Sequence, residues 1–172
     1  FKLIELNQKF KFLKKNTFLL DLGASPGGWS QVASKIITSG KILSIDIKKM
    51  EPIQNVKFVN SDIFNQKTKE IIQTFFGKEL DVVISDMAAD TTGNKSLDCI
   101  RTNQLCAEVI NLSRKILKKN GVIVSKLFMG EDFLEVKQKA KSLFKDVFFY
   151  KPESSKNESK ETYLHCKNLK AL

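Results

Sequence analysis

The sequence has few of the residues that build metal sites and disulfide frameworks. It holds three cysteines, none of them in a Cys-x-x-Cys pair, and one histidine among 172 residues. This pattern argues against disulfides and a zinc site, and it favours a reducing, intracellular compartment. The histidine, His165, precedes Cys166 in an alternating run whose neighbours point to opposite faces. We therefore expect no metal, and we interpret His165 as a structural residue.

Long apolar stretches are also missing. No run approaches the roughly 18 apolar residues that cross a bilayer, and the opening Phe-Lys-Leu-Ile-Glu lacks the layout of a signal peptide. Apolar residues make up 42% of the chain and charged residues 28%, a balance typical of a packed globular domain. We expect one domain over residues 1–172 without a membrane segment, located in a cytoplasm of bacterial type, with an organellar matrix as the alternative.

Acidic residues are outnumbered by basic ones. Lysine and arginine total 29 against 19 aspartates and glutamates, which gives a net charge of +10. An excess of this size favours a polyanionic partner such as nucleic acid. An AT-rich genome, which enriches lysine, explains the same excess, so both explanations stay open.

Seven short apolar runs, several of them β-branched or aromatic, are separated by helical patterns. The runs cover residues 17–21, 41–46, 56–60, 81–85, 121–127, 146–150 and 162–166. This alternation predicts an α/β fold with a mainly parallel sheet. Helical spacing over 105–116 is followed by Asn120-Gly121, which we interpret as the end of that helix. Only the loop 151–160 joins the last two runs, which favours an antiparallel pair at the sheet end.

A glycine-rich turn follows the first predicted strand. The segment 20–30 reads Leu-Asp-Leu-Gly-Ala-Ser-Pro-Gly-Gly-Trp-Ser, with a helix expected to begin near Trp29. Its Gly23-x-x-x-Gly27 spacing differs from the Gly-x-Gly-x-x-Gly of dinucleotide sites. Asp46 ends the second run, where an acid can accept hydrogen bonds from ribose hydroxyls, and Asp62 follows the third. Because all three features lie at the carboxyl ends of strands, they favour an adenosyl ligand.

Over nearly its whole length the chain resembles the FtsJ/RrmJ family of ribosomal-RNA large-subunit methyltransferases. The matching segments are Phe1-Lys2-Leu3, 21–31, Asp46 with 50–53, 85–88, 125–128 with Gly130, and residues within 151–163. The resemblance implies a Rossmann-like fold with a seven-stranded, mostly parallel sheet, helices on both faces and an antiparallel last strand. It divides the domain into a basic N-terminal segment, 1–15, and a catalytic core, 16–172.

The resemblance also implies an activity. Members transfer a methyl group from S-adenosylmethionine to a uridine ribose 2′-hydroxyl of ribosomal RNA, so we expect a monomer acting on the large subunit or its precursor. The catalytic residues it implies are Lys2, Asp86, Lys126 and Glu161. The cofactor-binding residues it implies are Gly27, Trp29, Asp46, Asp62 and Asp86, to which we add Gly23 of the glycine-rich turn.

Lys126 is unusual without any relative, because it lies inside an apolar run that is typical of a buried strand. A buried ammonium is costly unless it is paired or neutralised. A lysine at a strand end whose head reaches water is the structural alternative. We expect Lys126 to act as the general base, with Lys2 nearby and with Asp86 and Glu161 orienting the amines and the target hydroxyl.

RNA contacts are expected from two basic flanks on the catalytic face. They comprise Lys2, Lys9, Lys11, Lys14 and Lys15 in the first segment, and Lys151, Lys156 and Lys160 in the loop before the last strand. A merely solvated lysine face is the alternative. Other functions stay open: 2′-O-methylation of transfer RNA or an mRNA cap, a non-catalytic RNA-binding relative, a small-molecule methyltransferase and a nicotinamide dehydrogenase.

Overall fold

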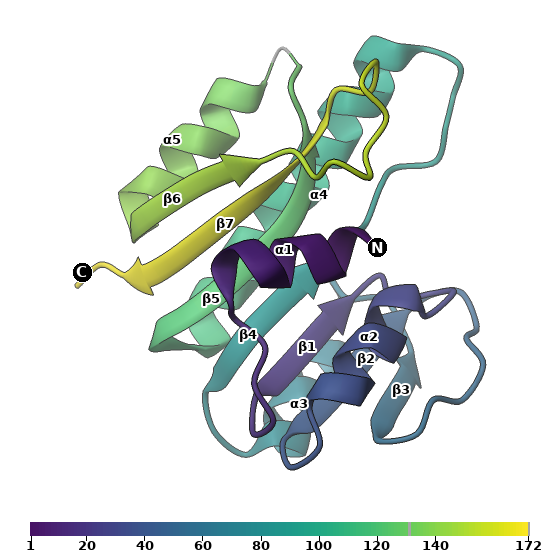
Figure 1. Ribbon diagram of the computed structural model, residues 1–172, viewed down its shortest axis with the longest axis vertical. Helices are drawn as coiled ribbons and strands as arrows, with labels where there is room; N and C mark the ends of the chain where they lie inside the picture. Colours follow the sequence, from purple (N-terminus) through teal and green to yellow (C-terminus); the bar gives the residue numbers. More distant parts are fainter. Residues whose placement is uncertain (131, 172) are drawn as a thin grey trace.

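A computed structural model describes residues 1–130 and 132–171 as one sheet with helices on both faces (Figure 1). The helices are α1 (Lys2–Phe10), α2 (Gly28–Ile36), α3 (Gln66–Phe76), α4 (Lys95–Ile116) and α5 (Phe133–Leu143). The strands are β1 (Phe18–Leu22), β2 (Lys41–Asp46), β3 (Val56–Asn60), β4 (Leu80–Ser85), β5 (Leu117–Phe128), β6 (Phe144–Tyr150) and β7 (Glu161–Leu169). Each predicted apolar run corresponds to one of these strands.

The sheet has seven strands in the order β3-β2-β1-β4-β5-β7-β6. Neighbours from β3 to β5 pair in parallel, whereas β7 lies antiparallel to both β5 and β6. This confirms the α/β prediction and the antiparallel pair across the loop 151–160. The carboxyl ends of β1 to β5 and the beginning of β7 therefore meet at one edge of the sheet.

Two apolar clusters fill the space between sheet and helices. Residues of β1, such as Leu20 and Leu22, pack with α3, α4 and α5 on one face, and Leu19 packs with α1 and α2 on the other. Alternate residues of a strand point to opposite faces, so a β1 that is buried on both sides must be apolar almost throughout. Among the described residues, no helix is long and apolar enough to cross a membrane.

The N-terminal segment is part of this packing. Leu3 and Leu6, three residues apart on α1, are fully buried in the same cluster as Leu19. Spacing of three residues places two side chains on one face of a helix, which explains why α1 lies flat against the sheet. This helix was not among the elements expected from the sequence.

One boundary prediction was wrong. Asn120-Gly121 does not end a helix: α4 stops at Ile116, and β5 already begins at Leu117. The register between β4 and β5 shifts from Leu80 opposite Leu117 to Val82 opposite Val122, which leaves the extra residues of β5 as a bulge. The Asn-Gly pair belongs to that bulge.

Candidate active site

A cavity of about 330 Å³ lies at the carboxyl ends of β1 to β4. Four residues predicted to hold a cofactor line it, namely Gly23, Asp46, Asp62 and Asp86. Gly27 and Trp29 are not part of the lining, and their cofactor contacts stay a prediction. Its volume lies in the range of small-molecule sites.

The glycine-rich turn brings the backbone close to this cavity. Gly23 has φ 70°, and a Cβ there would lie 2.0 Å from Cγ of Met87, so a side chain has neither the conformation nor the room. The amides of Gly23 and Ala24 donate to the carbonyl of Ile45 at 2.8 and 3.1 Å. These bonds fix the turn against β2. The helix α2 begins at Gly28, one residue before the predicted start.

Asp46 and Asp62 are held in place by backbone amides. The Asp46 carboxylate accepts from the amides of Ser25 and Lys48, both at 2.9 Å, and Asp62 Oδ1 accepts from the amide of Phe64 at 2.9 Å. Each carboxylate oxygen has a further lone pair for a ligand. Two exposed apolar side chains also line the cavity, Ile47 and Phe64. Carboxylates beside exposed apolar surface suit a nucleoside, whose ribose is polar and whose base is flat.

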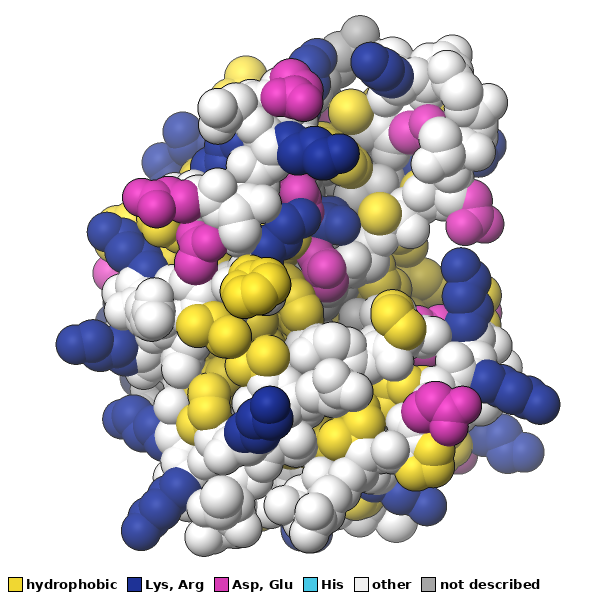
Figure 2. Space-filling model, turned by 45° about the vertical axis from the view of Figure 1, so that its right-hand side comes forward, with side chains coloured by type: hydrophobic (Ala, Val, Ile, Leu, Met, Phe, Trp, Pro, Cys, Tyr) yellow, Lys and Arg dark blue, Asp and Glu magenta, His cyan; other side chains and the backbone are white. Residues whose placement is uncertain are grey.

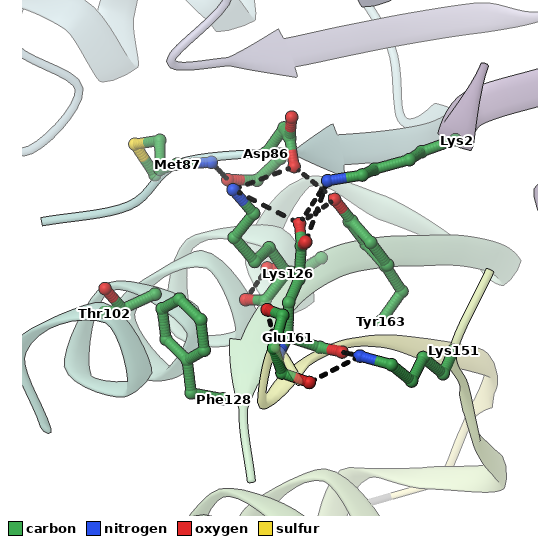
Figure 3. Close-up of polar contacts among 12 residues, drawn as sticks. Lys2, Asp86, Met87, Thr102, Lys126, Phe128, Lys151, Glu161 and Tyr163 are labelled. Atoms are coloured by element: carbon green, nitrogen blue, oxygen red, sulfur yellow. Dashed lines mark hydrogen bonds and ion pairs between the residues drawn. The ribbon is translucent and has the colours of Figure 1, made fainter. Parts of the chain in front are cut away.

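The four predicted catalytic residues meet next to this cavity (Figure 3). Lys2 Nζ donates to both carboxylate oxygens of Glu161, at 2.9 and 2.8 Å. Lys126 Nζ lies 3.4 Å from Asp86 Oδ1 and 3.5 Å from Glu161 Oε1. Two lysine side chains and two acidic side chains thus alternate from α1 through β7 and β5 to the end of β4. We refer to Lys2, Asp86, Lys126 and Glu161 as the tetrad.

Tyr163 completes the group, and sequence reasoning assigned it no role. Its hydroxyl lies 2.6 Å from Asp86 Oδ1 and 2.7 Å from Glu161 Oε1, within donating distance of both (Figure 3). Burial and the two neighbouring carboxylates raise the pKa of Tyr163, so the hydroxyl keeps its proton. Its ring lies 5.6 Å from that of Trp29. The sequence signal that could have indicated its role is its position two residues after Glu161, because alternate residues of a strand lie on the same face.

Glu161 is a carboxylate in spite of its burial. Burial acts to raise its pKa, but the hydrogen bonds from Lys2 and Tyr163 and the charges of Lys126 and Lys2 outweigh it and lower the pKa. The residue is 7% exposed, so its charge depends on these partners. Figure 2 shows acidic and basic side chains gathered near the middle of one face, above a group of hydrophobic side chains.

The loop before β7 is tied to α1 and to itself. Glu5 accepts hydrogen bonds from the amides of Glu153 and Ser154 at 2.7 and 2.9 Å. Lys151 Nζ donates to the carbonyls of Ser159 and Glu161 at 2.6 and 3.0 Å. Lys151, expected to contact RNA, therefore has its amine engaged in holding the backbone next to Glu161.

The N-terminal lysines do not all border the catalytic edge. Lys11 and Lys14 line a different cavity, together with Phe18 and Val82 at the beginnings of β1 and β4. That is the opposite edge of the sheet from the tetrad. The expectation that the whole basic segment flanks the catalytic face was therefore wrong, because α1 carries the chain from one edge of the sheet to the other.

A larger cavity of about 610 Å³ lies beyond the end of β5 and the beginning of β7. Phe128, two residues after Lys126, lines it together with Cys99 and Gly130, and Lys95 and Lys160 stand among its lining residues. Residues 86–90 line the first cavity, whereas Thr91 and Lys95 line the second. Asp86 of the tetrad lines the first cavity, and the second is lined by Phe128 and Lys160, which are close in sequence to Lys126 and Glu161.

Asp21 is a buried acid that sequence reasoning did not single out as a site residue. It is 1% exposed in β1, and Ser30 Oγ donates to its Oδ2 at 2.7 Å while also lying 2.7 Å from Ser44 Oγ. Burial raises the pKa of Asp21 to about 7; the hydrogen bond from Ser30 opposes this, and the charges of Asp86 and Asp46 add to it. This network joins β1, α2 and β2 beneath the glycine-rich turn.

Comparison with protein families gives a match over nearly the whole chain. Residues 1–169 match the model of the FtsJ-like methyltransferases. A Pelagibacter ubique protein named ribosomal RNA large subunit methyltransferase E is 45% identical over 170 residues, covering 99% of this chain and 84% of that protein. A Rickettsia akari protein of the same name is 44% identical, covering 99% of this chain and 78% of that protein.

Solved structures agree with the fold. A Plasmodium falciparum protein named as a ribosomal RNA methyltransferase superposes with a TM-score of 0.86 at 32% identity, covering 98% of this chain and 94% of that one. Human methyltransferase-like protein 13, in complex with SAH, superposes with a TM-score of 0.66 at 15% identity, covering 95% of this chain and 82% of that one. The second likeness concerns the fold alone.

Proposed function

Because the chain belongs to the FtsJ-like methyltransferase family, we propose that it methylates the 2′-hydroxyl of a uridine ribose in large-subunit ribosomal RNA, using S-adenosylmethionine. The observation that carries this proposal is the tetrad, which lies beside a nucleoside-sized cavity. Ribosomal RNA is the substrate named for the curated relatives. The coarser conclusion, membership of a methyltransferase family, confirms the resemblance seen in the sequence.

The cavity at the carboxyl ends of β1 to β4 fits the cofactor. We expect Asp46 to accept hydrogen bonds from the ribose hydroxyls and Asp62 to lie near the adenine; both residues line this cavity, as does Phe64. Gly23 lets the turn approach a ligand, since it carries no Cβ. When bound, S-adenosylmethionine supplies an electrophilic methyl group on a sulfonium.

Lys126 acts as the general base in this proposal. For this step Lys126 first releases its ammonium proton to solvent. Its neutral amine then accepts the proton of the ribose 2′-hydroxyl, while the oxygen forms its bond to the methyl group and the methyl group leaves its sulfur. The ammonium that results is stabilised by Asp86 and Glu161, 3.4 and 3.5 Å away. Lys2 balances the charge of Glu161, and Tyr163 holds both carboxylates at fixed positions. A positioned base of this kind contributes on the order of 10² to 10⁴ in rate.

The 610 Å³ cavity is the proposed place of the acceptor nucleotide. Phe128 offers an aromatic surface for a base that is splayed out of its helix, a common mode of RNA recognition. Lys95 and Lys160 stand where they can contact phosphates. In this proposal the acceptor enters from this cavity and the cofactor from the other, so that the attacking oxygen and the methyl group align for displacement.

In the same proposal the protein is a monomer located in the cytoplasm. Its substrate is ribosomal RNA within an assembled large subunit or its precursor. Tritiated S-adenosylmethionine, incubated with large subunits and with free ribosomal RNA, should label a uridine ribose, and more strongly in the particle. Labelling of transfer RNA or capped mRNA instead would show that one of these RNAs, and not ribosomal RNA, is the substrate. RNA binding without any transfer would make the chain a non-catalytic relative and overturn the proposal.

A further inference from the structure

A third cavity, of about 270 Å³, lies at the edge of the sheet opposite the tetrad. Phe18, Asp81 and Val122 of β1, β4 and β5 line it near the beginnings of these strands. Five lysines from separate parts of the chain surround it: Lys11, Lys14, Lys78, Lys118 and Lys167. We refer to this space as the lysine cavity. Figure 2 shows that lysine and arginine side chains also project around much of the outline of the molecule. The net charge of the chain alone therefore does not explain why five lysines surround one cavity.

The charges around the lysine cavity do not balance. Asp81 is the one acidic residue among its lining residues, and the structure already uses both of its oxygens. Oδ2 accepts from the amide of Phe18 at 2.8 Å, and Oδ1 pairs with Lys118 at 2.8 Å. Five positive charges against one leave an excess of four. Lysines gathered around one concavity repel one another, and a bound anion removes that repulsion.

The backbone that carries these lysines is fixed in advance. The amide of Leu13 donates to Asn7 Oδ1 at 2.9 Å, and that of Lys14 donates to Thr17 Oγ1 at 2.9 Å. The carbonyl of Lys15 accepts from the amides of Ser39 and Gly40 at 2.7 and 3.0 Å. A turn bound at both ends presents Lys11 and Lys14 without a large cost in backbone ordering.

Lys78 and Lys118 are held in a similar way from the other side. Lys78 follows Gly77, whose φ of 67° ends α3, and its amine lies 4.5 Å from the ring centroid of Phe18. Lys118 belongs to the bulge of β5 and is held by Asp81. Lys167 lies opposite Val122 in the pairing of β5 with β7. The bulge that contradicted the predicted helix end is thus what places a lysine on this cavity.

We propose that the lysine cavity binds backbone phosphates of the RNA substrate, at a second contact remote from the site of methyl transfer. This inference rests on the proposed function. Asp81 in β4 and Asp86, the residue that follows its end, mark the two sites; they are five residues apart, and strand rise makes that separation about 17 Å. A single nucleotide at the tetrad does not reach the cavity, so the second contact favours long or folded RNA over short fragments.

The test replaces three exposed lysines of the cavity with glutamine: Lys11→Gln, Lys14→Gln and Lys78→Gln. The logarithm of RNA affinity falls with the logarithm of salt concentration by about 0.7 to 0.9 per phosphate contact. Losing three contacts should flatten that slope by about 2 to 3. Between about 50 and about 200 mM salt, the parent should therefore lose about 20- to 40-fold more affinity for ribosomal RNA than the triple variant.

The matched control changes three exposed lysines outside the cavity: Lys57→Gln, Lys141→Gln and Lys145→Gln. It makes the same change in net charge and should keep the parent slope. A triple variant with arginine at 11, 14 and 78 should also keep it, because arginine retains the charge. Calorimetry with S-adenosylmethionine checks that each variant is folded. The proposed cofactor cavity lies at the other edge of the sheet, so these substitutions should leave cofactor affinity unchanged.

The outcomes separate this proposal from the proposed function. If the glutamine triple and the control have equal slopes, the lysine cavity does not bind RNA, even when methyl transfer is normal. If inorganic phosphate at constant ionic strength binds the parent tightly and the triple weakly, while both bind RNA alike, the cavity is a site for a small anion and the proposal is wrong. A parent chain that neither binds nor methylates ribosomal RNA overturns both proposals.

Discussion

Asp21 makes the stability of the protein depend on pH in an unusual direction. Burial raises the pKa of this carboxyl from 3.8 to about 7 in the folded state. Between these pH values the unfolded chain releases the proton and the folded chain keeps it. The contribution of Asp21 to stability is therefore complete below about pH 4 and is lost as the pH rises through about 7. At about 1.36 kcal/mol per pKa unit, the loss is on the order of 4 kcal/mol.

Asp21→Asn removes this titration and keeps the shape of the side chain and an acceptor for Ser30. Urea unfolding at several pH values gives the free energy of unfolding of both proteins. Between pH 4 and 8, the value for the variant should rise relative to that of the parent by on the order of 4 kcal/mol. Other groups titrate equally in both proteins and cancel in the difference. Ser30→Ala should move the inflection above pH 7, because its hydrogen bond lowers the pKa. If the difference in free energy of unfolding between parent and Asp21→Asn is constant over this range, the pKa of Asp21 is not raised in the folded state.

Three further predictions concern single side chains. Burial lowers the pKa of His165 to about 4, so the stabilisation that neutral His165 contributes is present above pH 6.5 and is lost as the pH falls to about 4, by about 3 kcal/mol. Urea unfolding of His165→Phe should lack this loss, and an equal loss in the variant would show that His165 is not its source. Asp46→Ala should weaken S-adenosylmethionine binding by about 1.5 to 3 kcal/mol; calorimetry that shows unchanged affinity would remove Asp46 from the site. Tyr163→Phe should lower the rate of methyl transfer about tenfold or more while cofactor affinity stays the same; single-turnover rates equal to the parent's would show that its hydroxyl does not position the carboxylates.

Local patterns predicted the sheet and one half of the site. Apolar runs separated by helical spacing predicted all seven strands. The signal is strongest for central strands such as β1 and β4, which are buried on both faces and must be apolar almost throughout. Asp46 and Asp62 were placed at one cavity because the carboxyl ends of parallel strands share an edge. These inferences depend on neighbours in the sequence, which is why pattern reasoning was sufficient.

The other half of the site depends on contacts between distant parts of the chain. Lys2 and Glu161 are 159 residues apart, and neither residue is unusual where it stands in the sequence. Family resemblance, not spacing, brought them together in the prediction. Tyr163 was missed because its role comes from the two carboxylates that face it. Lys11 and Lys14 were assigned to the wrong edge because the direction of α1 follows from the packing of Leu3 and Leu6.

Whether Lys126 is the base of the methyl transfer is decided by single-turnover transfer to saturating ribosomal RNA with Lys126→Ala and Lys126→Arg. Arginine keeps a positive charge between Asp86 and Glu161 but cannot release its proton to become a base. We expect both variants to bind cofactor and RNA, and both to transfer the methyl group about 10² to 10⁴ times more slowly than the parent. A rate for Lys126→Arg close to that of the parent would contradict this expectation and leave Lys126 a positioning cation.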